Sequence, residues 1–429
     1  MDRQGVQKLL AGLFAFALPL GTRVALFQVG SPAVPYTTLY LYATDLAAIA
    51  LVALAGRHPW QAIRQRPLIS ASLGVFFAIG IVSASISDLP LLGFITLARL
   101  AVFSLAALAL SEIITSIRAS YFLMPLLAGA ILQAILACWQ FFAQRSAGFM
   151  YLGEQTLGVA VTGVAKLDIA GEKIIRAYGT LPHPNVLGAF LVMALLAAIA
   201  MYSMPGGKMR GGMLLTAIAL MLAGLFFTFS RSAWLAFGIA IAILIAYAAI
   251  NVRRLPEAAF RRLATLGVLF AACWFAAAAL FSPYMLSRAS LPALHDQAVQ
   301  IRLNGFYWAA RMIDANKLFG VGPGQFVTQI TQTGVNLTES WMYQPVHSAY
   351  ALVAAEYGLA GALAFFVFIG SALWAWRKSR LKSENPLLHA AAFCIVAAFL
   401  VLGLFDHYFL TFEQGIGLFW VSVAFMLAA

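Results

Sequence analysis

Twelve apolar stretches, each about as long as a membrane-spanning helix, fill most of this sequence of 429 residues. A helix needs about 20 predominantly apolar residues to cross the hydrocarbon core of a bilayer. Hydrophobic residues make up 63% of the chain and charged residues 10%, which excludes a soluble enzyme, because soluble domains carry about a quarter charged residues. We therefore expect an all-α polytopic membrane protein with a single transmembrane domain over residues 1–429. The expected spans are 8–28, 37–56, 67–85, 90–111, 120–142, 183–203, 212–229, 232–250, 264–282, 346–375, 388–405 and 410–428.

Basic residues cluster in the short segments at alternate span ends. Lys and Arg accumulate on the cytoplasmic side of membrane helices, so this pattern predicts that both termini are cytoplasmic. The net charge of +12 then reflects orientation and does not indicate a nucleic-acid partner. Two longer polar segments fall on the periplasmic side: a smaller loop at 143–182 and a large loop at 283–345, between the ninth and tenth spans. Since the inner loops are too short for an ATPase or kinase domain, any chemistry is expected at the outer membrane face.

Asp45 and Arg99 are ionisable residues inside expected spans, where charges are costly and are functional candidates by default. Each lies eight or nine residues from the outer end of its span, which is roughly 12–14 Å at the helical rise. Equal depth predicts a structural ion pair between two helices, since removal of either partner would leave a buried charge. A direct role for the pair in function is the alternative.

Polar residues also gather at the outer ends of other spans. Because they share one depth, we expect them to line a single cleft that faces the outer leaflet. The alternative is that some of them only solvate loop ends, which is the simpler interpretation of His407 taken alone. The members are His183 with Asn185, Arg231, Arg302, His347, and Asp406 with His407.

Two of these residues stand at expected helix starts. Arg231 follows Ser230, a residue that caps helix N-termini, and its guanidinium lies beside the positive end of the helix dipole. His347 follows Pro345, which suits a first helical turn, and free amide groups there bind anions. Together with Arg302, these helix starts predict a pocket for a phosphate or diphosphate, because the planar fork of arginine binds phosphate oxygens in two places.

The large loop contains an amphipathic helix over residues 300–313, from which Arg302 and Arg311 reach outward. The glycine-rich segment 319–326 follows it and includes Gln325. This segment lacks the Lys-Ser/Thr of a phosphate-binding loop, so we expect a shaped turn that positions Arg302 relative to His347. Nine residues separate His347 from Glu356, which places them on opposite helix faces. We expect Glu356 to be neutral or paired.

Taken together, these motifs resemble those of the O-antigen ligase and polymerase superfamily. The resemblance covers most of the chain in layout, and its motifs concentrate in residues 180–360. They are Leu181-Pro182-His183-Pro184-Asn185, Ser230-Arg231-Ser232-Ala233-Trp234, the Arg302 helix, Gly320-Val321-Gly322-Pro323-Gly324-Gln325-Phe326, and His347 leading to Glu356-Tyr357-Gly358. The segment Phe405-Asp406-His407-Tyr408 matches no ligase signature, which leaves the acceptor open.

The resemblance implies a GT-C-like bacterial membrane glycosyltransferase with its active site facing the periplasm. Such enzymes take a glycan from undecaprenyl diphosphate and pass it to lipid A-core, as a ligase, or to a growing polysaccharide, as a polymerase. By motif, the family's catalytic residues fall on Arg231, Arg302 and His347. Arg231 and Arg302, together with His183, Asn185, Arg311 and Gln325, are then candidates for binding diphosphate and glycan. The family is described as needing no metal or nucleotide cofactor, and the sequence contains no Asp-x-Asp motif.

The charges of these residues suggest roles in the transfer. The two arginines would stabilise the diphosphate as its charge develops, and an inverting displacement needs a base such as His347. Alternatively, His347 binds phosphate as the imidazolium. A different class of function is a secondary transporter or a lipid or polysaccharide flippase, since twelve spans with both ends inside suit that class too. The grossly unequal outer loops favour the transferase.

Overall fold

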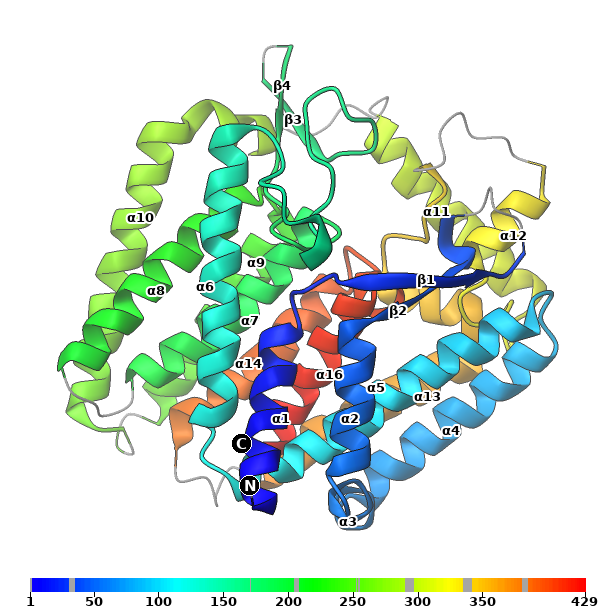
Figure 1. The fold of residues 1–429 in the computed structure, drawn as a ribbon, viewed down its shortest axis with the longest axis horizontal. Helices are drawn as coiled ribbons and strands as arrows, with labels where there is room; N and C mark the ends of the chain where they lie inside the picture. The colour runs from blue at the N-terminus through cyan, green and yellow to red at the C-terminus, as the bar shows by residue number, and fades with distance from the viewer. Residues whose placement is uncertain are drawn as a thin grey trace.

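The computed structural model describes residues 2–30, 35–169, 171–203, 208–251, 253, 255–289, 297–334, 342–379 and 385–429. The chain is predominantly helical in these ranges, with two small β-hairpins (Figure 1). The helices are α1 (Arg3–Ala17), α2 (Ala43–Leu54), α3 (His58–Gln65), α4 (Pro67–Ser85), α5 (Pro90–Ser116), α6 (Ser120–Ala143), α7 (Pro184–Ser203), α8 (Lys208–Phe227), α9 (Arg231–Ile250), α10 (Glu257–Ala289), α11 (Gln297–Ala315), α12 (Phe326–Gln332), α13 (Ala349–Ser379), α14 (Pro386–Leu402), α15 (Tyr408–Thr411) and α16 (Glu413–Ala428). The hairpins pair β1 (Arg23–Gln28) with β2 (Thr38–Tyr42) and β3 (Lys166–Ile169) with β4 (Glu172–Ile175), both antiparallel. Short 3₁₀ helices occur at η1 (Pro35–Thr37) and η2 (Met150–Leu152).

Eight of the described helices are long and apolar enough to cross a membrane, and α2, α14 and α16 are shorter apolar helices. The chain is therefore a multi-pass membrane protein, as the composition predicts. From residue 67 onward, each expected span coincides with one of these helices. The number of crossings and their orientation remain predictions.

The first two expected spans are wrong in detail. The stretch 8–28 is helical only to Ala17, and the stretch 37–56 begins as strand β2 before α2 starts. Pro19 and Gly21 interrupt the first stretch, and both residues disfavour a helix interior. The residues that follow are rich in β-formers, so the chain stays apolar but becomes a strand.

Both chain termini lie at one end of the helical bundle, and the two hairpins lie at the opposite end with α11 and α12 (Figure 1). Helix α7 forms the centre of the larger part of the core, and every residue from Pro184 to Ser203 is buried. It packs against α8, α9 and α14. This arrangement fits the prediction that the termini share one membrane side, away from both polar loops.

The ion pair predicted between Asp45 and Arg99 is present. The Arg99 guanidinium donates to both carboxylate oxygens, at 3.1 Å and 3.0 Å, and to the carbonyl of Tyr40. Asp45 also accepts a hydrogen bond from the backbone N–H of Tyr42 at 3.0 Å, which caps the start of α2. Asp45 thus lies in the first helical turn rather than two turns deep, because β2 replaces the expected beginning of the span.

Helix α13 is broken at Gly358, whose φ of 71° and ψ of −179° are not helical. The glycine-rich segment docks against this break and pairs with its backbone. The N–H groups of Val321 and Gly322 donate to the carbonyls of Ala355 and Glu356 at 2.9 and 3.0 Å. In return, the carbonyl of Lys317 accepts from the N–H of Leu359 at 2.8 Å. A break at membrane depth is tolerated only where the freed backbone groups find partners within the protein, and this segment supplies them.

The side chain of Glu356 completes this junction. Its two carboxylate oxygens accept hydrogen bonds from the N–H groups of Gly324 and Phe326, at 2.9 and 3.2 Å. The expectation that Glu356 is paired is confirmed, and its partners are main-chain amides. The glycine-rich segment therefore acts as a structural turn, as predicted.

We expect Gly358→Ala to destabilise the protein strongly. A methyl group at this position would lie 2.2 Å from the carbonyl oxygen of Leu318, and the positive φ disfavours any L side chain. The loss should be at least about 2 kcal/mol, measured as a lower thermal unfolding midpoint in detergent. The matched control is Gly370→Ala in the same helix, where no atom lies within 4 Å of the added methyl and the effect should be neutral or stabilising. Equal midpoints for the two variants would contradict this account of the break.

We expect Arg99→Ala to lower stability by about 3 kcal/mol, because it leaves the buried Asp45 carboxylate without its cation. Thermal unfolding of the purified protein measures the effect. Arg261→Ala serves as the control, since the Arg261–Glu257 pair is largely exposed and such pairs contribute less than about 1 kcal/mol. A loss for Arg99→Ala no larger than that of the control would show that the buried pair does not hold α2 to α5.

Candidate active site

Asp406 is the centre of a buried polar cluster at the hairpin end of the bundle. It lies between α14 and α15, and only 6% of its surface is exposed. The side-chain amide of Asn185, at the start of α7, donates to Asp406 Oδ2 at 2.7 Å. The backbone N–H of His407 donates to Oδ1 at 2.9 Å. The carboxylate is therefore held by hydrogen bonds to both of its oxygens.

Arg176 extends this cluster into the smaller polar loop. One guanidinium N–H donates to Asn185 Oδ1 at 2.8 Å, and Nε donates to the carbonyl of Thr228 at 2.7 Å. Arg176 is itself buried. The chain of contacts from Arg176 through Asn185 to Asp406 joins segments more than 200 residues apart. The sequence analysis missed Arg176, although a lone arginine within an apolar run was a usable signal.

Three histidines surround Asp406. The rings of His347 and His407 lie edge to face with centroids 5.5 Å apart, and His407 Nδ1 lies 2.8 Å from the hydroxyl of Thr411. His183 Nδ1 accepts a hydrogen bond from the N–H of Asn185 at 3.2 Å. The interpretation of His407 as a residue that merely solvates a loop end is therefore wrong, because His407 is buried within the cluster.

The pKa values of these groups follow from burial and from their mutual charges. Burial lowers the pKa of His183 to about 3 and that of His407 to about 4, although the Asp406 charge opposes both shifts. Burial also lowers the pKa of His347, and the nearby Arg302 charge lowers it further. Burial opposes ionisation of Asp406, but the adjacent imidazoles and Asn185 outweigh it, so the pKa of Asp406 lies below its ordinary value. At neutral pH the cluster therefore holds a carboxylate among neutral imidazoles.

The part of α11 that carries Arg302 approaches the chain directly before His347, and the charge of Arg302 acts on the His347 imidazole. Arg302 lies on the same face of α11 as Gly305, Ala309 and Met312, all of which are buried. A methyl group at Gly305 would lie 3.2 Å from the Cα of Val346, so α11 approaches the chain directly before His347. The Nδ1 atom of His347 is buried and has no hydrogen-bond partner among the described residues. The His347 imidazole therefore has a nitrogen left unsatisfied by the described residues and also feels the charge of Arg302.

Arg231 is the first residue of α9, and the Ser230 hydroxyl caps this helix by accepting from the N–H of Ala233. A methyl group at Gly188 of α7 would lie 3.4 Å from the Cβ of Ser230, which places this helix start against the beginning of α7. The carbonyl of Thr228 accepts from Arg176, so the chain reaches Arg231 directly from the buried cluster. A single cavity shared by Arg231, Arg302 and His347 remains a prediction.

Two candidate substrate contacts lie elsewhere. Gln325 is fully buried, and its side chain bonds to Ser87 and to both backbone groups of Leu89. It fastens the glycine-rich segment to the turn between α4 and α5, and its predicted contact with substrate remains a prediction. Arg311 is exposed and lies above the ring of Tyr307 at 6.0 Å. It is nine residues from Arg302 and therefore on the opposite face of α11, away from His347.

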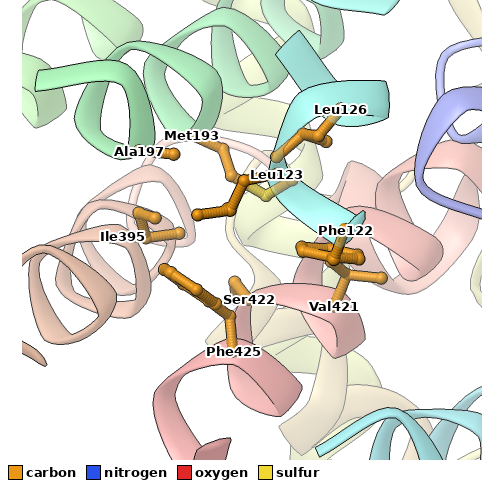
Figure 2. Close-up of a pocket in the computed structure, with 9 residues that line it drawn as sticks. All are labelled: Phe122, Leu123, Leu126, Met193, Ala197, Ile395, Val421, Ser422 and Phe425. Carbon is orange, nitrogen blue, oxygen red and sulfur yellow. The ribbon is translucent and has the colours of Figure 1, made fainter. Parts of the chain in front are cut away.

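A small cavity lies inside the bundle between α6, α7, α14 and α16 (Figure 2). Apart from Ser422, its lining is apolar, and the Ser422 hydroxyl is bonded to the carbonyl of Phe419. Its lining residues are Phe122, Leu123, Leu126, Met193, Ala197, Ile395, Val421, Ser422 and Phe425. An apolar cavity of this kind does not suit a charged headgroup. The candidate site is therefore the histidine cluster, not this cavity.

Comparison with known proteins finds a family similarity over one segment of the chain. Residues 216–366 match the family model described as O-Antigen ligase. This segment runs from α8 through the middle of α13 and contains Arg231, Arg302, His347 and the glycine-rich segment. No curated protein matches the sequence. The resemblance inferred from motifs is confirmed over residues 216–366.

We expect the stability of the protein to fall as pH is lowered from 7 to 5, with His407 as one cause. Unfolded, its imidazole titrates near 6.5, whereas in the fold its pKa is about 4. The unfolded chain binds the proton first, so the stability present above pH 6.5 is lost as pH falls towards 4. The loss from this residue at pH 5 is about 2 kcal/mol. His407→Gln should show a smaller drop in thermal midpoint between pH 7 and 5, and identical drops would contradict the assignment.

Proposed function

We propose that this protein is a metal-independent membrane glycosyltransferase of O-antigen ligase type that acts at the periplasmic face of a bacterial inner membrane. It transfers a glycan from undecaprenyl diphosphate to lipid A-core or, as a polymerase, to a growing polysaccharide. The observation that carries this proposal is the family match over residues 216–366, which encloses Arg231, Arg302 and His347. The proximity of Arg302 to His347 gives it independent structural support.

The two arginines bind the diphosphate of the donor. Cleavage of the bond between the sugar and the diphosphate leaves an additional negative charge on the departing oxygen. Guanidinium groups stabilise such a charge more strongly in a site shielded from water than in solution. The N-terminus of α9 at Arg231 adds backbone N–H groups to the same task. This arrangement lowers the barrier because it is most favourable when the charge has developed.

His347 acts as the general base. The acceptor hydroxyl gives its proton to His347 while its oxygen attacks the anomeric carbon. The carbon–oxygen bond to the diphosphate breaks, and its electron pair leaves with the diphosphate, so the anomeric centre inverts. A base must be neutral before the reaction, and the lowered pKa of His347 supports this role over that of an imidazolium bound to phosphate.

Asp406 supports the base. The negative charge of Asp406 raises the proton affinity of His347 against the opposing effect of burial. Once His347 has taken up a proton, this carboxylate stabilises the imidazolium. Asn185 and Arg176 hold the carboxylate in place through the hydrogen bonds described above. We therefore assign Asn185 and Arg176 as positioning residues, and His183 as a neutral neighbour that lines the cluster.

We expect Arg231→Ala, Arg302→Ala and His347→Ala each to reduce glycan transfer at least about 100-fold without loss of expression. The assay uses purified protein, an undecaprenyl diphosphate-linked glycan and lipid A-core, in the presence of EDTA. Lys317→Ala is the control, since Lys317 follows α11 and its salt bridge with Asp314 is largely exposed, and its activity should be close to wild type. Normal transfer by all three variants would remove the site assignment.

The products identify the reaction. A single glycan attached to lipid A-core indicates a ligase, whereas lengthening of the lipid-linked glycan when donor is the only substrate indicates a polymerase. Loss of activity in EDTA would contradict metal independence. Movement of lipid-linked glycan across sealed vesicles with no covalent product would instead indicate a flippase and overturn the proposed function.

A further inference from the structure

The two hairpins at the same end of the molecule have opposite surface characters. The exposed side chains of the β3–β4 hairpin include Asp168, Glu172 and Lys173, which suit water. On β1, Val24 is 63% exposed and Phe27 is 49% exposed, and the residues between them are exposed as well. A two-stranded hairpin with several bare apolar side chains along one strand is not suited to water.

A second apolar group adjoins β1. The 3₁₀ turn η2 and the residue before it expose Phe149, Met150 and Tyr151, the last at 91%. Two hydrogen bonds of 2.8 Å tie this turn to the start of β1, from the Thr22 hydroxyl to the carbonyl of Tyr151 and from the N–H of Gly21 to the carbonyl of Leu152. We call these six residues, Val24, Leu26, Phe27, Phe149, Met150 and Tyr151, the apolar rim.

The turn in the rim is held rigidly rather than left loose. The buried carboxylate of Glu154 accepts hydrogen bonds from three successive backbone N–H groups, those of Ala147, Gly148 and Phe149, at 2.6–2.8 Å. Gln140 at the end of α6 donates to the same carboxylate at 2.8 Å. The apolar side chains are thus presented by a preorganised backbone, which a passive surface loop does not require.

The position of the β1–β2 hairpin along the neighbouring helix α5 indicates which medium surrounds the apolar rim. The Arg99 guanidinium reaches the carbonyl of Tyr40 in β2, and Arg99 lies nine residues from the start of α5, roughly 14 Å along the helix. Val29 and Leu39 pack against Leu92 of the same helix. The hairpin therefore runs beside the first turns of a long apolar helix, not beyond its end.

The helices on either side of the hairpin explain this position. α1 has 15 residues and α2 has 12, which correspond to roughly 22 and 18 Å, whereas the hydrocarbon core is about 30 Å thick. α6 and α5, against which they pack, have 24 and 27 residues and are long enough to span it. The hairpin occupies the level that α1 and α2 do not reach, where Leu91 and Phe94 of α5 also expose apolar side chains.

We infer that the apolar rim is a membrane-seated surface whose partner is the bilayer itself, at the boundary between lipid headgroups and acyl chains. The boundary is favoured over the hydrocarbon centre because an open hairpin edge has backbone groups that need water. Arg145 lies over the ring of Trp139 at 5.9 Å beside the rim, a pairing suited to the headgroup level.

The segment before β2 leads from the hairpin to the histidine cluster. Its residue Tyr36 stacks on the ring of Phe412, and the ring centroids of Phe412 and His407 are 6.0 Å apart. Tyr36 and Phe412 therefore connect the segment before β2 to the histidine cluster.

Spin labelling of the full chain tests this inference. Val24→Cys and Tyr151→Cys are labelled with a nitroxide after Cys138, Cys273 and Cys394 are replaced by Ala. The protein is reconstituted in phosphatidylethanolamine–phosphatidylglycerol vesicles, and collisions with oxygen and with a water-soluble nickel chelate are measured. Asp168→Cys on the β3–β4 hairpin is the matched control. We expect a ratio of oxygen to nickel accessibility several-fold higher at positions 24 and 151 than at position 168.

Two outcomes would overturn the inference. Nickel accessibility at positions 24 and 151 equal to that at position 168 would place the rim in water. Low accessibility to both reagents, with spin–spin broadening, would show that a second copy of the chain covers it. Phe27→Cys repeats the measurement if Val24→Cys does not fold. The readout requires no glycan transfer, so it can fail or succeed independently of the proposed function.

Discussion

The pairing of main-chain hydrogen bonds between the glycine-rich segment and the break in α13 is the interaction on which the arrangement of the site depends. A spanning helix that stops being helical exposes backbone groups which lipid cannot satisfy. Here the backbone N–H groups of Val321 and Gly322 donate to the carbonyls of Ala355 and Glu356. The Glu356 carboxylate accepts two further hydrogen bonds from N–H groups of the glycine-rich segment. Because this segment follows α11, the same junction anchors the helix that carries Arg302 near His347.

In the polar cluster around Asp406, side chains likewise find their hydrogen-bond partners within the protein. A buried carboxylate is costly unless it is paired and hydrogen-bonded. Asn185, the His407 amide and three imidazoles provide that environment, and Arg176 completes it from a separate loop. The result is a preformed site in which a neutral imidazole stands beside a carboxylate and an arginine. Such preorganisation lets charge develop during a reaction without rearrangement of the protein.

Candidate site residues could be predicted from the sequence where a charged side chain stands out against apolar surroundings. His347 was found at the start of an expected span, Arg302 in the amphipathic helix of the large loop, and Asp45 and Arg99 as charges within apolar stretches. The substrate contacts predicted for Gln325 and Arg311 remain predictions, because a polar side chain in a loop sequence can serve the fold or the substrate equally well. Only coordinates show that Gln325 is used by the α4–α5 turn and that Arg311 projects from the other side of α11. Arg176 was missed because its partners, the Asn185 side chain and the carbonyl of Thr228, become its neighbours only in the fold.

Sequence alone predicted a multi-pass membrane protein and a family resemblance, because run length, apolarity and local motifs are properties of neighbouring residues. Tertiary structure decided where the helices break, that the first apolar stretch continues as a strand, and which polar groups share a buried cluster. Those outcomes depend on hydrogen-bond partners contributed by distant segments. In a medium without water, a polar group must find its partner within the protein, and that partner has no fixed spacing in the sequence.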